Sequence, residues 1–407
     1  MILASGTGGL FEHSVTVLGA LLVLGALIAG LARRSFLSLT AVFVLAGFAL
    51  GHGGLQVLEF KPTSGFVASL AVVALILLLF RDGLEVEAEM LQTAWRLPLR
   101  KLVLAMPITC ALVAVAGRVL TDLSWTECFL VGALLSPTDP VLSSSVVTNP
   151  RVPRLIRHSL NLESGLNDGL ALPAVLVFAG ALDASRHDFV WWKFVLQDVS
   201  LGLVTGLVVG YAASRLMPRA RALRTDISAD QKALYALGVA FLAYGVAVLP
   251  PHGNGLIAVF VCAIVLGIRR PDIRACFEER SQDLIEVVKL GVFLVFGTLL
   301  TLDGMFGDGL AAVALVAFLL LVARPVAVFA ALAGTRTDAA TRAFMSWFGP
   351  KGVATMTFAL LVLAESGIAE RERIFNLAAL AVLVSIVAHG VTDVAGAEWI
   401  ARRASKA

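Results

Sequence analysis

The sequence has few charged residues for its length. Charged residues make up 15% of the 407 positions, whereas apolar residues make up 58% and the mean hydropathy is +0.89. Soluble domains carry about 25% charged and about 45–50% apolar residues, so a soluble chain of this length would lack the polar surface it needs. The 36 glycines suit close contact between helices in lipid. The composition therefore predicts an integral membrane protein.

Three further absences exclude other classes. The four cysteines show no CxxC or CxxxC spacing, so neither a metal site nor a disulfide framework is indicated. The net charge of +3 is not gathered in a basic patch or tail, and we expect no nucleic-acid partner. No basic residue precedes the first apolar segment, and Arg33 and Arg34 follow it. This order predicts a retained first span rather than a cleaved signal. We expect no cofactor.

Long apolar segments fill almost the whole chain. A helix that spans a membrane needs about 20 mostly apolar residues, and by this criterion we expect an all-α polytopic protein of about thirteen transmembrane helices. The expected spans are 14–32, 36–51, 64–80, 102–120, 126–147, 159–182, 190–213, 233–250, 253–268, 284–302, 309–333, 341–364 and 374–397. The loops between them are short, so we expect one transmembrane domain, 1–407, and no soluble domain.

Basic residues indicate the orientation. With the N-terminus outside and the C-terminus in the cytoplasm, most lysines and arginines fall in the inner loops and few in the outer loops. We therefore expect a multi-pass protein of the inner or plasma membrane. Basic residues of the loops, among them Arg100 and Lys101, are interpreted as topology signals. Lys289, Arg324 and Lys351 fall inside spans, where charge is expensive, and each is a functional candidate.

Two spans are interrupted by helix-breaking residues. The fifth carries Ser-Pro-Thr-Asp-Pro at 136–140, and the twelfth carries Gly-Pro-Lys-Gly at 349–352. Two such breaks seven spans apart predict inverted repeats, with spans 1–6 and 8–13 as the halves and span 7 as connector. Broken helices near the bilayer midplane are tolerated where they line a cavity or pack in protein, and paired breaks indicate the binding site of a transporter. We expect helices 5 and 12 to cross there.

Two aspartates carry the expected chemistry. Pro140 lacks an N–H group and disfavours helical geometry at Asp139, so nearby carbonyls such as that of Thr138 become free to bind a small cation. Asp168 lies about ten residues into span six, roughly 15 Å deep, and shares a helix face with Ser164. A carboxylate at that depth must be protonated, be paired or hold a cation. The simpler alternatives are that Asp139 caps a half-helix and that Asp168 is a buried, neutral acid.

Two other charged sites have expected structural roles. Arg324 in span eleven needs a partner, and Glu163 in span six lies at a similar depth, so a buried ion pair between them is expected. Lys351 is expected to balance the half-helix dipole ends at the crossing.

These residues together resemble a known family. Thr138-Asp139-Pro140, the later Glu163-Ser164-x-x-Asn167-Asp168, Arg324-Pro325 and the break at 349–352 resemble the NhaP/NHE branch of the monovalent cation:proton antiporters. The resemblance covers nearly the whole chain and implies the NhaA-like antiporter fold. It also implies a homodimer, with spans 4–6 and 11–13 as the moving core and spans 1–3 and 7–10 as the scaffold.

The resemblance also implies residue roles. Asp168 would carry the sodium ion and the proton in turn, with Asp139, Ser164, the Thr138 carbonyl and Asn167 at the cation site. A neutral Asn167 before Asp168 is typical of the electroneutral branch. The end of span three departs from the pattern, because Arg81 stands where many relatives carry an acid, although the next residue is Asp82.

Other activities use the same residues differently. A potassium/proton antiporter of the same fold is the nearest alternative, because the same oxygen ligands suit either ion. A cation channel is less favoured, since channels usually assemble their filter from repeated subunits. An intramembrane aspartyl protease could use Asp139 and Asp168 as a dyad, but Ser164 and Asn167 would then have no function. We expect a transporter and not an enzyme.

Overall fold

The structure of the protein is a computed structural model. It describes residues 16–20, 22–23, 39–86, 96–139, 146, 149–185, 189–218, 227–250 and 252–404. All regular secondary structure in these residues is helical, which agrees with the predicted all-α class. Seven of the described helices are long and apolar enough to cross a membrane. The total of thirteen spans and their inverted repeats stay predictions.

The helices follow one another with short connections. In chain order they are α2 (Leu39–Leu50), α3 (Gly65–Leu84), α5 (Arg96–Arg100), the π-helical turn η1 (Lys101–Ala105), α6 (Met106–Leu120), α7 (Trp125–Leu135), α9 (Arg154–Leu182), α10 (Trp191–Phe194), η3 (Val195–Val199), α11 (Ser200–Leu216), α12 (Ala229–Val248), α13 (Gly255–Arg269), α14 (Pro271–Arg280), α15 (Gln282–Thr298), α16 (Leu302–Met305), α17 (Leu310–Phe318), η4 (Leu319–Ala323), α18 (Arg324–Ala331), α19 (Ala339–Trp347), α20 (Val353–Ala364) and α21 (Arg371–Ala404).

Helices overlap each predicted span from the second to the thirteenth, with differences at their ends. The predicted first span, 14–32, lies mostly outside the described residues. The sequence did not predict the polar helix α14 or the single turn α16. Helix α9 begins at Arg154, five residues before the predicted start, because a hydropathy criterion finds only the apolar part of a helix.

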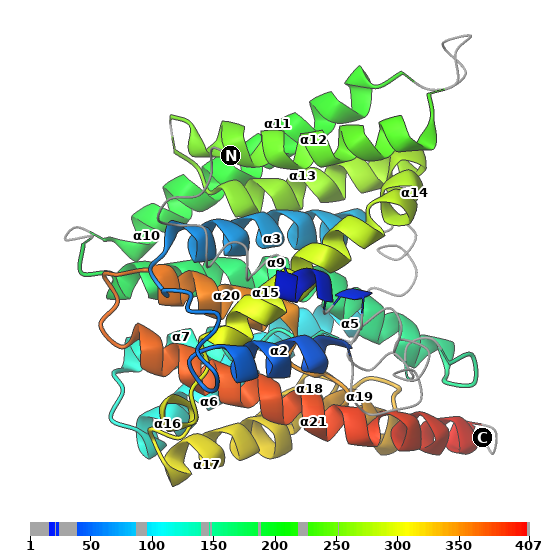
Figure 1. Ribbon diagram of the computed structural model, residues 1–407. Coiled ribbons are helices and arrows are strands. Elements are labelled where there is room, and N and C mark those ends of the chain that lie inside the picture. Colours follow the sequence, from blue (N-terminus) through cyan, green and yellow to red (C-terminus); the bar gives the residue numbers. More distant parts are fainter. Residues whose placement is uncertain are drawn as a thin grey trace.

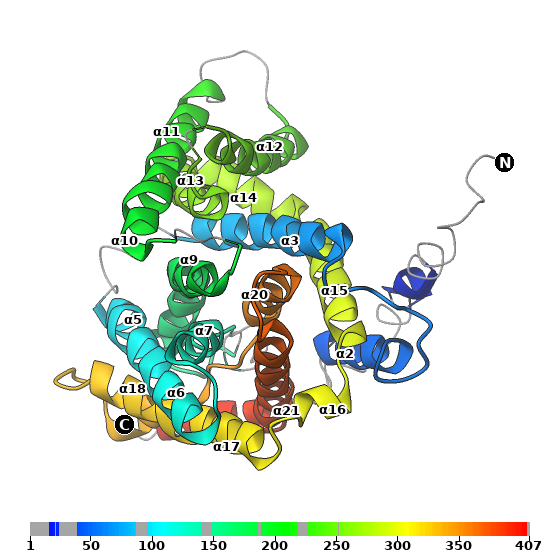
Figure 2. The same ribbon diagram turned by 90° about the vertical axis from the view of Figure 1, so that its left-hand side faces the viewer.

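The long helices form two groups with α3 between them. Most of them run side by side across Figure 1. Figure 2, which looks along them, shows α11 to α14 on one side of α3, and α7, α9 and α20 on the other. Helix α3 packs against α13 on the first side and against α9 and α20 on the second. Helix α3 therefore contacts both groups through different faces.

Glycines allow the closest helix packing in the first group. Gly202, Gly206 and Gly210 lie four residues apart on α11 and face α13. A Cβ atom at Gly206 would lie 2.6 Å from the carbonyl oxygen of Ala258, which is closer than atoms can approach. Small residues at this spacing let two backbones touch, as in other helix pairs within membranes.

Candidate functional site: two broken helices that meet

The two predicted helix breaks contact each other. Helix α7 ends at Leu135, and the chain from Ser136 to Asp139 is not helical. The second break separates α19 from α20. The backbone N–H of Asp139 donates to the carbonyl oxygen of Pro350 over 2.8 Å. The N–H of Val353, in the first turn of α20, donates to Asp139 Oδ2 over 3.4 Å. A carboxylate is stabilised at the positive end of a helix dipole, so Asp139 does cap a half-helix.

Gly352 is required by this close approach. A Cβ atom at position 352 would overlap the side chain of Asp139. Any other residue there would push the two breaks apart. The close approach of the two breaks therefore explains why position 352 is a glycine.

Lys351 lies across the end of the opposite half-helix. Its ammonium donates to the carbonyl oxygens of Pro137 over 3.0 Å and Ser136 over 3.4 Å, just beyond the C-terminal end of α7. The side chain is fully buried, and its backbone N–H donates to Ser385 Oγ on α21 over 2.8 Å. A cation beside carbonyls at a helix C-terminus is favourable, as the sequence predicts for this lysine.

Asn167 joins α9 to the first break. Its amide nitrogen donates to the carbonyl oxygen of Thr138 over 2.6 Å and to Thr138 Oγ1 over 3.0 Å. The backbone carbonyl oxygen of Thr138 keeps a second lone pair that can bind a cation. Among the described residues, the buried Oδ1 of Asn167 has no hydrogen-bond partner. The amide thus fixes Thr138 in position and still leaves an acceptor unsatisfied.

Asp168 is buried one residue further along α9, with 8% of its surface exposed. No hydrogen bond to its carboxylate is found within the described part of the chain. The charged groups that act on it are Asp82, Asp139 and Arg81. Two of these three neighbours are acids, so a bare carboxylate here is poorly compensated and favours binding a proton or a metal cation.

The side chain of Ser164, a residue of the predicted cation site, lies outside the described residues, as does Pro140 of the first break. The structure therefore brings together Thr138, Asp139 and the Asn167–Asp168 pair.

The predicted ion pair between Glu163 and Arg324 is present, with an Nη2–Oε1 distance of 3.3 Å. A third residue joins it, because Lys101 also forms an ion pair with Glu163. Arg324 Nε donates to the carbonyl oxygen of Ser346 over 3.0 Å. The interpretation of Lys101 as a loop residue is wrong, since its side chain is fully buried in η1. Lys101 lies directly before a predicted span, and a lysine at such a position can point either to the membrane surface or into the helix bundle. This position was the feature of the sequence that could have suggested a buried role.

Comparisons with known proteins agree with this geometry. A family model described as sodium/hydrogen exchanger, transmembrane, matches residues 20–395. The chain belongs to this exchanger family.

Individual relatives support the NhaP branch. The K(+)/H(+) antiporter NhaP of Alkalimonas amylolytica is 26% identical over 392 residues, which cover 95% of this chain and 67% of the relative. The K(+)/H(+) antiporter NhaP2 of Shewanella oneidensis is 27% identical over 394 residues, which cover 93% and 66%. The chain thus spans about two thirds of the length of these curated relatives.

A solved structure shows the same fold. The sodium proton antiporter MjNhaP1 of Methanocaldococcus jannaschii, at pH 8, superimposes with a TM-score of 0.80 at 18% identity. The match covers 96% of this chain and 99% of that one. The predicted antiporter fold is confirmed.

Two other buried polar residues of this exchanger, Lys289 and His389, form local contacts. Lys289 pairs with Glu286 one turn away over 2.9 Å. His389 contacts two backbone carbonyls, with 2.7 Å from Nε2 to Trp347 O and 2.7 Å from Nδ1 to Ser385 O.

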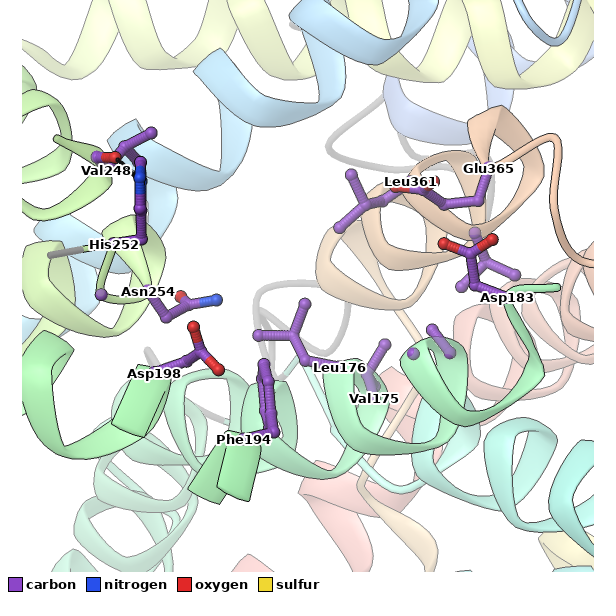
Figure 3. A pocket seen from close by; sticks show the side chains of 14 residues that line it. Val175, Leu176, Asp183, Phe194, Asp198, Val248, His252, Asn254, Leu361 and Glu365 are labelled. Carbon is purple, nitrogen blue, oxygen red and sulfur yellow. Dashed lines mark hydrogen bonds between the residues drawn. The ribbon is translucent and has the colours of Figure 1, made fainter. Parts of the chain in front are cut away.

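A cavity of about 230 Å³ lies between α9 and α20 on one side and α10, η3 and the end of α12 on the other (Figure 3). Asp183 and Glu365 lie together at one end, and Asp198 lies beside Asn254 at the other. Val175 on α9 lines the cavity, and it lies seven residues beyond Asp168, about 10 Å along the same helix face.

Apolar side chains pack around α9 next to Asp168. Leu172, between Asp168 and Val175 in the sequence of α9, is fully buried. The ring of Phe260 on α13 occupies the space where Gly169 would carry a Cβ atom. Helix α9 is therefore in close contact with the other helix group directly beside Asp168.

Proposed function

We propose that the protein exchanges a monovalent cation for protons across the membrane by alternating access. One observation supports this above the others: Asp168 is buried beside the helix crossing with two acidic neighbours and one arginine. A proton and a cation compete for this carboxylate, so binding one requires release of the other. Asp139, Ser164, Asn167 and the Thr138 carbonyl complete the cation site in this proposal.

Sodium is the first candidate for the cation. A carboxylate, a hydroxyl and a backbone carbonyl are hard oxygen ligands, which suit sodium. MjNhaP1, which has the same fold, is described as a sodium proton antiporter. Potassium is the second candidate, because the curated relatives that match almost the whole chain are named K(+)/H(+) antiporters. The exchange is electroneutral in this proposal, since Asp168 carries either one proton or one cation.

Two ionic clusters support a core that moves as one body. At one end of the bundle, Lys101, Glu163 and Arg324 connect η1, α9 and α18. At the other end, Arg373 on α21 donates to Asp308 before α17 over 2.9 Å and to Asp122 before α7 over 2.5 Å.

We also propose how the helices divide between a moving core and a fixed scaffold. Helices α2, α3 and α10 to α15 form the scaffold, and spans 4–6 and 11–13 form the core. The scaffold carries the contact of a homodimer in the plasma membrane, with the N-terminus outside and the C-terminus in the cytoplasm.

Proton flux in reconstituted vesicles tests the exchange. Vesicles are loaded with a pH-sensitive dye and their interior is made acidic relative to the outside. Sodium, potassium or lithium chloride is then added outside in turn, at equal ionic strength. We expect sodium, or potassium for the second candidate, to dissipate the gradient with saturable kinetics.

Asp168→Asn is the matched control, because it keeps the shape of the side chain and removes the exchangeable charge. This variant should fold with wild-type thermal stability or better and show no cation-dependent flux. Proton movement in wild-type vesicles without any of the three cations would contradict the proposal. Normal exchange by Asp168→Asn would assign the carrier role to another group, with Asp139 the first to test.

A further inference from the structure

Three charged residues follow one another at the C-terminal end of α3, and they become more buried toward the site. The side chain of Glu85 is 50% exposed, that of Arg81 22% and that of Asp82 only 5%. Arg81 Nη2 donates to Asp82 Oδ1 over 2.7 Å and Nε donates to the same oxygen over 2.9 Å. Arg81 also reaches Glu85 Oε1 at 3.8 Å. The arginine thus connects an exposed acid to a buried one.

The buried acid of this series lies against the exchange site. Helix α3 packs on α9 and α20, the two helices that carry Asp168 and follow the second break. A Cβ atom at Gly165, three residues before Asp168, would lie 3.5 Å from the carbonyl oxygen of Asp82. Asp82 is one of the two acids whose charge acts on Asp168, and Asp82 and Asp139 also act on each other through space.

Other charged groups act on the pair from neighbouring elements. Asp139 acts on both Arg81 and Asp82, and Glu85 acts on both from the same helix. Arg274 and Glu278 on α14 act on Glu85 and complete the set.

An arginine has a specific consequence beside a buried acid. A carboxylate that is buried without a partner takes up a proton rather than stay charged. The guanidinium cannot lose its own proton, so it favours the ionised form of a directly bonded carboxylate. Asp82 therefore presents a negative charge to Asp168 over a wider pH range while Arg81 is bonded to it.

We propose that Arg81 and Asp82 form a charge pair on the scaffold helix that sets the affinity of the exchange site for its cation. Asp82 supplies the negative charge that strengthens cation binding at Asp168, and Arg81 is the positioning residue that favours the ionised form of Asp82 and limits its effect. This inference rests on the proposed exchange function. A pair that only anchored the end of α3 would affect stability and leave the affinity unchanged.

A charge-compensation series tests the pair in the vesicle assay. The apparent KM for the transported cation is measured from about pH 6 to about pH 9, the range in which a buried carboxylate can titrate. Asp82→Asn leaves Arg81 with only the half-exposed Glu85 as counter-charge, so the positive charge beside the site should raise the KM about tenfold. The double variant Asp82→Asn/Arg81→Gln removes the excess positive charge and should recover most of that loss. Arg81→Lys retains the charge and should stay close to wild type.

Arg81→Gln gives a signature that a structural role would not produce. Asp82 loses its partner and becomes protonated at low pH, where the KM should equal that of the double variant. At high pH Asp82 ionises without compensation, and the KM should fall below that of wild type. Glu286→Gln, which breaks the Lys289–Glu286 pair on α15, is the matched control and should leave the KM unchanged.

The outcomes separate this inference from the proposed function. Wild-type protein without cation-dependent proton flux would overturn the exchange function itself. Wild-type exchange with an unchanged KM in folded Asp82→Asn would overturn only the charge pair. If Asp82→Asn does not fold, Arg81→Gln is compared with the double variant. Identical KM values for these two variants at every pH would equally overturn the inference. Melting temperatures of all variants monitor folding.

Discussion

The buried cluster of Glu163, Lys101 and Arg324 leads to a quantitative prediction about stability. One carboxylate faces two cations, and all three side chains are at most 8% exposed. Glu163→Gln would leave both cations without a counter-charge. Removing one partner of a buried ion pair typically costs about 3–5 kcal/mol, whereas removing a whole pair can be nearly neutral. We therefore expect Glu163→Gln to lower the free energy of unfolding by about 4 kcal/mol.

Lys101 is expected to behave differently from Glu163. Lys101→Met leaves the Glu163–Arg324 pair with balanced charge, so its cost should be much smaller, about 1 kcal/mol. The double variant Glu163→Gln/Lys101→Met removes one excess cation and should be more stable than Glu163→Gln alone. This order depends on the third member of the cluster, which contacts Glu163 directly.

Thermal melting in detergent measures these differences. An unfolding entropy of about 2 cal/mol/K per residue, over 407 residues, converts 4 kcal/mol into a shift of about 5 °C. Helices that persist in the unfolded state reduce this entropy and enlarge the shift. Equal melting temperatures for Glu163→Gln and Lys101→Met, or a double variant less stable than both, would refute the charge argument.

Three further predictions concern voltage, packing and pH. The ion gradient at which exchange stops should be the same at zero and at −100 mV, because one charge moved across 100 mV would contribute about 2.3 kcal/mol and shift it visibly. Gly169→Ala should lower the maximal exchange rate, since its Cβ would strike the Phe260 ring, and adding Phe260→Ala should recover part of the rate; a normal rate in Gly169→Ala would contradict this packing. A hydrogen bond from Arg270 lowers the pKa of Asp272 from 3.8 to about 2, so its stabilisation is present above pH 3.8 and is lost toward pH 2. The melting temperatures of wild type and Asp272→Asn should therefore converge as the pH falls below 3.8, and a constant difference would contradict the assignment.

The sequence by itself determined the class, the location of most helices and the two breaks. Low charge and long apolar segments are sufficient for the first two, because lipid requires every backbone group to be bonded within a helix. The breaks at 136–140 and 349–352 follow from proline and glycine, whose backbone effects are local. The Glu163–Arg324 pair was also predictable, since a charge within a membrane needs a partner.

Only the tertiary structure decided which groups meet. No local pattern distinguishes Lys101, which turns into the bundle and joins Glu163, from Arg100, the adjacent basic residue at the same helix end. The approach of Gly352 to Asp139, and that of Asp82 to Asp168, depends on how separate helices cross. Coulomb energy depends on the distance between charges and on their burial, and both are set by packing between segments far apart in the chain. The sequence therefore names the charged residues, and the packing of α3, α7, α9 and α20 decides which of them act on one another.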